Sequence, residues 1–159
     1  IELVIALANE MLDIAGIDAD PREAITSGRA MDHWRRMVSA QGGDPDAPLP
    51  VARHQHVITA PVAGPLSTLE AYGVGVAAWR LGAGRAHKED EIVHGAGVQL
   101  HAKPGDMLSE GQPIMTLLAD DEARLPAAIA ELEGSWEIGG EPMDRHPLII
   151  TRFDENTRG

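Results

Sequence analysis

The chain has 159 residues, a formal net charge of −12 and no cysteine. This length can bury a full hydrophobic core without the support of disulfide bonds or structural metal ions. The acidic charge and an aromatic share of only 3% argue against surfaces for nucleic acid or anionic membranes, and the missing thiols exclude cysteine nucleophiles and thiolate metal sites. Neither a membrane-spanning run nor a secretory signal pattern is visible, so we expect a cytoplasmic protein.

The first part of the sequence predicts three helices. Residues 1–15 carry apolar side chains at helical spacing and are followed by a glycine suited to a helix C-terminus. Asp20 and Pro21 are typical of a helix N-terminus and predict a second, short helix. A third helix is expected over 30–41. Because each helix has one apolar face and the first begins without a cap, we expect residues 1–48 to be part of a larger domain whose upstream portion is missing.

A change of composition marks a domain boundary. Three prolines within residues 44–53 predict an extended linker, and we place a second domain at 49–159. The β-branched run 56–59 predicts a short strand, after which residues 62–65 turn the chain. The second domain therefore opens with β-structure.

Ser67 and Glu70 stand three residues apart, as in a capping box, and predict a helix over 68–81. Two glycines inside this segment cost about 1 kcal/mol each relative to alanine and indicate close backbone packing onto a sheet. Gly82 is expected to end the helix, because glycine adopts a positive φ without a Cβ penalty.

The glycine-rich stretch 81–113 ends in two tight turns that flank a short strand, at Gly105-Asp106 and Glu110-Gly111. Turns so close together are typical of a small β-barrel. The remaining sequence predicts a strand over 114–118, a helix over 120–132, a polar loop over 133–145 and a strand over 147–153. Together these segments indicate an α+β fold.

Five histidines are candidate metal ligands. His87, His94 and His101 recur every seven residues, a spacing that brings ligands near one face of a helix. Intervening glycines and a following proline argue against a helix there, and an odd spacing alternates faces in a strand. His54 and His56 would share a strand face, but no third ligand accompanies them. We interpret all five as surface or hydrogen-bonded histidines and expect no metal site.

A glycine pair raises the possibility of a nucleotide site. Gly82-x-Gly84 matches part of a dinucleotide fingerprint, but His87 occupies the third glycine position, and the pattern follows a helix where a strand is required. We therefore expect no cofactor. Packing in the core or at an interface is the simplest role for the three tryptophans, Trp34, Trp79 and Trp136.

Two charged groups admit both a functional and a structural interpretation. Arg85 and Lys88 could bind an anion, but a solvated turn with a salt bridge to Glu89 or Asp90 is the simpler interpretation. The acids at 120–122 could form a catalytic carboxylate cluster. However, acids at a helix N-terminus are favoured by the helix dipole, and we interpret this cluster as a cap.

Part of the sequence resembles a carrier domain. The runs 60–64 and 105–114 are similar to the second half of a lipoyl or biotinyl carrier domain, with about 40 residues inserted between them. Such a carrier needs a modifiable lysine at a hairpin tip, and neither Lys88 nor Lys103 has the expected neighbours. A lipoyl- or biotinyl-like binding module without enzymatic activity therefore remains the alternative.

Ordered motifs along nearly the whole chain carry a more specific resemblance. They are Ala6–Leu12, Ser27–Ala30, Met37–Pro45, Ala60–Gly64, Leu81–Arg85, Asp90–Gly97 and Gly105–Pro113. In this order they resemble the C-terminal third of the thymidine and pyrimidine nucleoside phosphorylase family. The match is weaker between residues 124 and 145, and Val93 stands where the family usually has an acid.

The resemblance implies both a fold and a reaction. Residues 1–48 would belong to a large α/β domain and residues 49–159 to an α/β-hammerhead domain with a barrel-sandwich core. The parent would be a homodimeric pentosyltransferase that converts thymidine and phosphate to thymine and 2-deoxyribose 1-phosphate. In the family, the groups that hold phosphate and pyrimidine precede the segment that matches Ile1. We therefore expect no catalytic, cofactor-binding or metal-binding residue here, and a scaffolding role beside the cleft.

Overall fold

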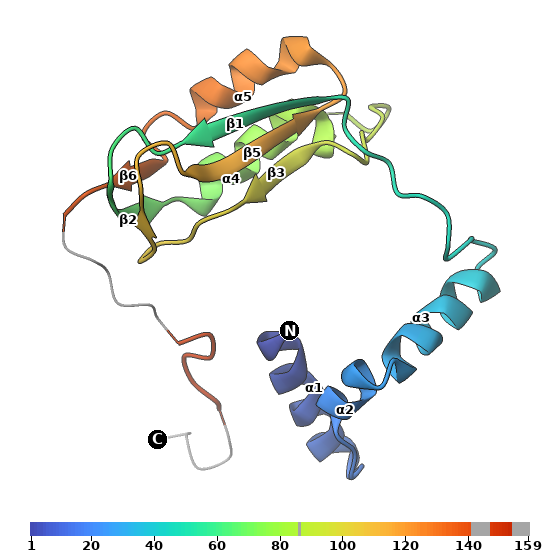
Figure 1. Ribbon diagram of the computed structural model, residues 1–159. Helices are drawn as coiled ribbons and strands as arrows, with labels where there is room; N and C mark the ends of the chain where they lie inside the picture. The colour runs from blue at the N-terminus through green and yellow to red at the C-terminus, as the bar shows by residue number, and fades with distance from the viewer. Residues whose placement is uncertain (86, 141–146, 154–159) are drawn as a thin grey trace. The chain divides into compact units, whose positions relative to one another are not determined.

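A computed structural model describes residues 1–85, 87–140 and 147–153, which form an α+β structure in two compact units (Figure 1). The first unit consists of Ile1–Pro48 together with the described C-terminal residues. The second begins at Leu49 and holds every strand of the described chain. None of the helices in the described ranges is long and apolar enough to cross a membrane.

The first unit contains the three predicted helices, α1 (Glu2–Ala15), α2 (Pro21–Thr26) and α3 (Arg29–Ala40). Gly16 ends α1 with φ of 65°, as predicted, and Asp20 caps α2 by accepting a hydrogen bond of 2.8 Å from the N–H of Arg22. Ile5 is the only buried residue that the three helices contain. Their apolar faces are therefore largely exposed in this chain.

The described C-terminal residues 147–153 belong to the first unit. Arg152 ties them to α1 through ion pairs with Glu10 at 2.6 Å and Asp13 at 3.8 Å. The strand predicted for this segment is wrong, because residues 147–153 have no regular secondary structure. Its β-branched sequence favours a strand, but no strand of the described chain pairs with it.

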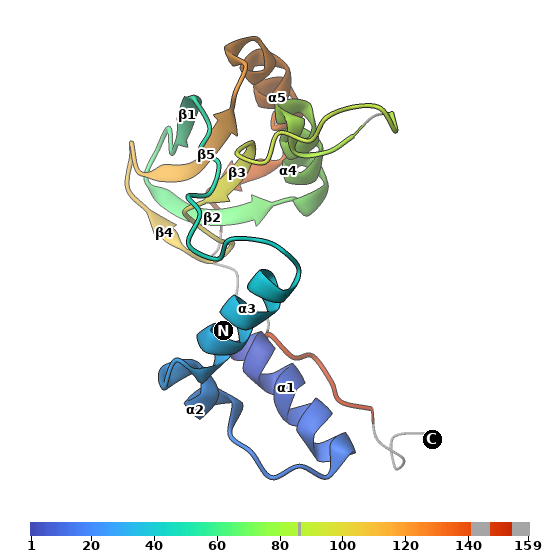
Figure 2. The ribbon, with the colours of Figure 1, turned by 90° about the vertical axis from the view of Figure 1, so that its right-hand side faces the viewer.

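The second unit contains two antiparallel sheets of three strands each (Figures 1 and 2). One sheet has the order β1-β5-β3 and the other the order β4-β2-β6. The strands are β1 (His54–Thr59), β2 (Gly64–Leu69), β3 (Gly97–Leu100), β4 (Met107–Leu108), β5 (Pro113–Ala119) and β6 (Trp136–Ile138). The predicted strands over 56–59 and 114–118 are confirmed as β1 and β5, whereas β3 was not predicted.

The predicted pair of tight turns is confirmed. Gly105 and Gly111 have φ of 91° and 79°, and the short strand β4 lies between them. The second turn is closed onto the end of β1, because the N–H of Gly111 donates to the carbonyl of Ala60 at 2.8 Å. These turns therefore connect the two sheets.

The capping box predicted at Ser67 and Glu70 is wrong. Strand β2 is the central strand of the β4-β2-β6 sheet and pairs with both of its neighbours. Ser67 lies within β2, where its hydroxyl donates to the carbonyl of Glu137 at 3.1 Å. The helix begins only at Ala71, as α4 (Ala71–Ala78), with no side-chain cap. Leu66, fully buried in β2, explains the difference, because core packing outweighs a local capping signal.

Helix α4 continues into a π-helical turn, Trp79–Ala83, in which Gly82 has φ of 111°. This confirms the prediction that a glycine with positive φ ends the helix. The predicted close packing also holds at Gly73, but its neighbours are Ser135 and the carbonyl of Glu131 rather than a sheet. Helix α4 therefore packs against the end of α5 and the segment that follows it.

The helix predicted over 120–132 starts with a 3-10 turn, Glu122–Arg124, and continues as α5 (Leu125–Glu131). Asp121 accepts a hydrogen bond of 3.0 Å from the N–H of Ala123, which confirms that these acids include a cap. The loop predicted over 133–145 is partly wrong, because β6 lies inside it. The part of the prediction that falls on 141–145 lies outside the described residues.

One core fills the second unit. It is built from α4, α5 and the inner sides of both sheets, and the largest fully buried side chains are Leu66, Leu81, Ile114, Met115, Leu117 and Leu132. Helices α4 and α5 lie beside each other against the β1-β5-β3 sheet (Figure 1). This core fixes the end of α4, where the pocket described next is formed.

Candidate functional site

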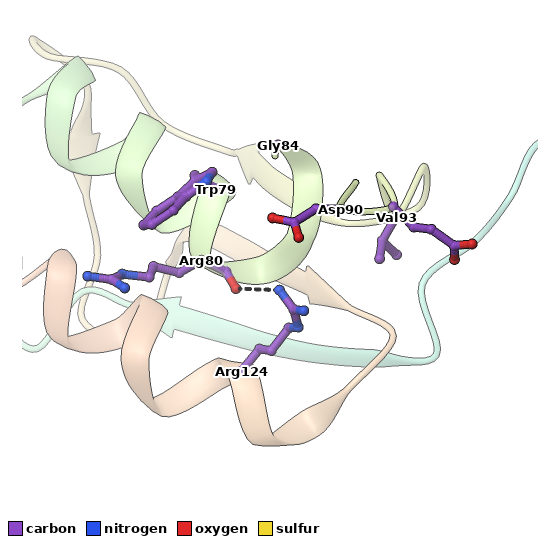
Figure 3. Close-up of a pocket in the computed structure, with 7 residues that line it drawn as sticks. Trp79, Arg80, Gly84, Asp90, Val93 and Arg124 are labelled. Carbon is purple, nitrogen blue, oxygen red and sulfur yellow. Dashed lines mark hydrogen bonds between the residues drawn. The ribbon is translucent and has the colours of Figure 1, made fainter. Parts of the chain in front are cut away.

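A pocket of about 510 Å³ lies at the end of α4 (Figure 3). Trp79 and Arg80 come from the π-helical turn, and Arg124 reaches the pocket from the start of α5. Asp90 and Val93 face them from the loop that follows Gly84. The pocket therefore combines an indole, two guanidinium groups and two carboxylates, those of Asp90 and Glu91.

The two arginines of this pocket make structural contacts. Arg80 forms an ion pair with Glu131 of α5 at 2.8 Å, and its guanidinium lies 4.8 Å from the centre of the Trp79 ring. Arg124 donates a hydrogen bond of 3.3 Å to the carbonyl of Arg80 (Figure 3). Since the Arg80–Glu131 pair is partly exposed, it contributes about 0–1 kcal/mol. Both arginines thus connect the end of α4 to α5.

The loop opposite the arginines is held by hydrogen bonds that its backbone N–H groups donate. The N–H of His87 donates to Asp90 at 2.9 Å, and the N–H of Val93 donates to the carbonyl of Gly82 at 2.9 Å. The ring Nδ1 of His87 also lies 3.7 Å from the Asp90 carboxylate. The salt bridge expected from Arg85 or Lys88 stays a prediction.

The candidate histidines do not come together. His101 donates or accepts a 2.7 Å hydrogen bond with Thr116, which confirms the hydrogen-bonded interpretation for this residue. Thr116 is only 6% exposed, whereas His101 itself is exposed, so this bond fixes a surface histidine to the sheet. His54 lies 3.9 Å from Glu122. Within the described ranges, no three histidine, cysteine or acidic side chains are grouped as metal ligands would be.

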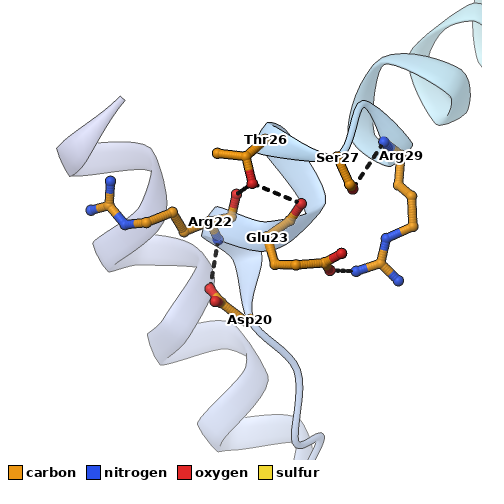
Figure 4. A network of polar contacts seen from close by, with 6 residues as sticks. All are labelled: Asp20, Arg22, Glu23, Thr26, Ser27 and Arg29. Carbon is orange, nitrogen blue, oxygen red and sulfur yellow. Dashed lines mark hydrogen bonds and ion pairs between the residues drawn. The ribbon is translucent and has the colours of Figure 1, made fainter.

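A second polar network lies between α2 and α3 (Figure 4). Arg29 forms an ion pair with Glu23, and its backbone N–H donates to Ser27 at 3.5 Å. The hydroxyl of Thr26 donates a hydrogen bond of 3.1 Å to the carbonyl of Arg22. These contacts fix the turn between the two helices, and the network is fully explained by that structural role.

The comparison with known proteins gives the family. Residues 66–139 match the family model described as "Pyrimidine nucleoside phosphorylase C-terminal domain". The chain belongs to the pyrimidine nucleoside phosphorylase family. In the structure, the matched residues of this phosphorylase domain run from β2 through α4 and α5 to β6 and include the pocket at the end of α4.

Several relatives of the phosphorylase family match beyond the domain itself. The thymidine phosphorylase of Mycobacterium tuberculosis (strain ATCC 25618 / H37Rv) is 45% identical over 154 residues, which cover 96% of this chain and 36% of that protein. The pyrimidine-nucleoside phosphorylase of Bacillus subtilis (strain 168) is 37% identical, with 93% and 37% covered. The AMP phosphorylase of Pyrococcus furiosus is 34% identical, with 81% and 26% covered.

The chain thus spans about a third of the length of the curated phosphorylases it matches. The family resemblance carried by the sequence motifs is confirmed. Contacts from Arg124 to Arg80 and from Arg80 to Glu131 were not predicted, because they join residues 44 and 51 positions apart that no local pattern connects.

Proposed function

We propose that this chain is the C-terminal part of an enzyme that cleaves thymidine, or a related pyrimidine nucleoside, with phosphate. The products are the free base and 2-deoxyribose 1-phosphate or ribose 1-phosphate. One observation carries the proposal: 45% identity, over 96% of the chain, to a protein named thymidine phosphorylase. In a chain that spans only a third of such relatives, the activity belongs to the complete polypeptide.

The role of this part is scaffolding, and it supplies no catalytic, cofactor-binding or metal-binding residue. The contacts of the pocket support this role, because Arg80 and Arg124 join α4 to α5 and Asp90 binds the backbone of its own loop. A rigid unit beside a cleft can move with one wall, and closure of that cleft excludes water from the reacting centre.

The domain assignment follows the same proposal. Residues 1–48 are a helical segment of the large α/β domain, and an α/β-hammerhead domain begins at residue 49. Division of the chain into two compact units at this point supports the boundary, and the grouping of residues 147–153 with α1 adds them to the first domain. The complete enzyme is a homodimer that acts in the cytoplasm and binds phosphate and a pyrimidine nucleoside.

The test is to express the complete coding sequence and to measure the release of thymine from thymidine in the presence of phosphate. We expect phosphate-dependent turnover by the complete enzyme and none by the 159-residue chain. Absence of turnover by the complete enzyme with thymidine, uridine and deoxyuridine would overturn the proposal.

The mass of the expressed chain distinguishes the carrier alternative from the phosphorylase. A lipoyl- or biotinyl-like carrier would gain the mass of its prosthetic group at Lys88 or Lys103 after expression with lipoate or biotin. Lys103 lies in the turn before β4, where its N–H donates to Asp106 at 2.8 Å. An unchanged mass together with phosphorolysis by the complete enzyme supports the phosphorylase.

A further inference from the structure

A groove of about 410 Å³ runs along strand β1 in the second unit. Four consecutive residues of β1 form one side, and residues from the end of α5 to β6 form the other. The lining residues are His56, Val57, Ile58 and Thr59 on the strand side and Ile129, Leu132, Glu133, Gly134 and Trp136 opposite. At about 3.3 Å per residue, the strand side is roughly 13 Å long.

The groove follows a strand edge that is open for pairing. In the part of the chain that the structure describes, β1 pairs only with β5, and Figure 1 shows it at the border of its sheet on the side of α5. Natural edges are usually protected by lysine, by proline or by a bulge in mid-strand. Strand β1 contains no lysine and no proline, and its register shift lies at its last two residues instead of mid-strand. Val57, in the middle of the strand, is 46% exposed.

Carboxylates outnumber arginine around this edge, because Glu133, Glu122 and Asp120 lie there beside Arg53. Glu133 lines the groove, and none of the lining residues is lysine or arginine. At the first residue of β1, Glu122 lies 3.9 Å from His54, and Asp120 accepts a hydrogen bond from the N–H of Arg53 at 3.2 Å. A segment that lies along β1 therefore meets carboxylates beside an apolar floor.

We propose that the β1 groove binds an extended segment of a separate protein chain, apolar in its middle and basic at its ends, as an additional strand of the β1-β5-β3 sheet. Backbone hydrogen bonds to the free edge give the affinity in such complexes, and alternate side chains in the groove give the specificity. Valine- or isoleucine-sized side chains fit against Ile58 and Ile129, while lysine or arginine pairs with the carboxylates.

The probe is a capped seven-residue peptide with lysine at both ends and alternating valine and threonine between them. It is titrated into the ¹⁵N-labelled 159-residue chain, and the amide shifts of residues 54–59 are followed. We expect shifts confined to β1 and the groove, and binding that weakens with salt. The same peptide with glutamate at both ends should bind at least fivefold more weakly.

Two variants and a matched control test the position of the peptide. Val57→Lys should weaken binding at least tenfold, and Glu133→Lys at least threefold. Gln55→Lys introduces the same charge on an exposed residue of the same strand outside the groove, and should change binding less than twofold. Unchanged thermal unfolding of each variant shows that the fold is intact.

Three results would overturn the inference. The first is no shift in β1 at millimolar peptide, and the second is equal binding to Val57→Lys and Gln55→Lys. The third is binding to the 159-residue chain but not to the complete enzyme, which would mean that the enzyme itself covers the groove.

Discussion

Gly73 is the residue at which α4 has least room, and its replacement by alanine tests the packing of the second unit. A Cβ at this position would lie 2.0 Å from the Oγ of Ser135 and 2.8 Å from its Cβ. The Ser135 hydroxyl could rotate away, but its Cβ moves only with the backbone. Ser135 is also 8% exposed and bonded to the carbonyl of Glu131 at 3.1 Å, so little space is available for such a shift.

The expected loss follows from three contributions. Alanine favours the helix over glycine by about 1 kcal/mol. Overpacking of a filled site costs about 1–3 kcal/mol, and disturbance of the buried Ser135 hydrogen bond costs about 1 kcal/mol more. We therefore expect Gly73→Ala to destabilise the chain by about 1–3 kcal/mol.

The same helix provides the control. Gly75 has nothing within 4 Å of the position of its missing Cβ, so Gly75→Ala keeps only the propensity gain and should stabilise by about 0.5–1 kcal/mol. Urea unfolding followed by tryptophan fluorescence measures both variants. Equal changes in the two free energies of unfolding would refute the packing described for Gly73.

Three further predictions concern single contacts. Leu66→Ala should cost about 2–5 kcal/mol in urea unfolding, because Leu66 is fully buried in β2; a change below 1 kcal/mol would contradict its place in the core. Asp20→Ala removes the cap of α2 and should cost about 0.5–2 kcal/mol, seen as faster amide exchange in α2, whereas Asp20→Asn should not. Val93→Asp should stabilise the chain by up to about 1 kcal/mol at low salt, because the side chains of Val93 and Arg124 lie close together. Both are within 3.5 Å of the position that a Cβ on Gly82 would occupy. Val93→Asn is the uncharged control, and equal melting temperatures of the two variants would argue against an ion pair between the introduced carboxylate and Arg124.

Local signals in the sequence predict most of the boundaries that depend on neighbouring residues. Gly16 and the Asp20 cap mark helix ends through backbone geometry that needs no distant partner. Gly105 and Gly111 do the same for the turns around β4. These positions are predictable because positive φ and capping are properties of a few adjacent residues.

The errors lie where distant residues decide the structure. Ser67 has the spacing of a cap, but its partner in the structure is Glu137, 70 positions away. Strand β6 has only three residues and is flanked by glycines and polar residues, so its pairing with β2 has no local signal. The segment 147–153 has the composition of a strand without a strand partner in the described chain.

The candidate site was predicted in part. Trp79 was expected to serve in packing, and it lies beneath the guanidinium of Arg80. Arg124 carried no sequence signal, because its role depends on the approach of α5 to the end of α4. The family, in contrast, could be recognised from ordered motifs, since these do not require any contact to be known.

The central claim is that this chain supports, but does not perform, the chemistry of a nucleoside phosphorylase. The most direct measurement compares kcat and KM for thymidine phosphorolysis between the complete enzyme and a variant that lacks the second unit, residues 49–145. We predict that the deletion lowers kcat at least tenfold and lowers the melting temperature, because one wall of the cleft loses its support. Unchanged kcat, KM and melting temperature would contradict the claim.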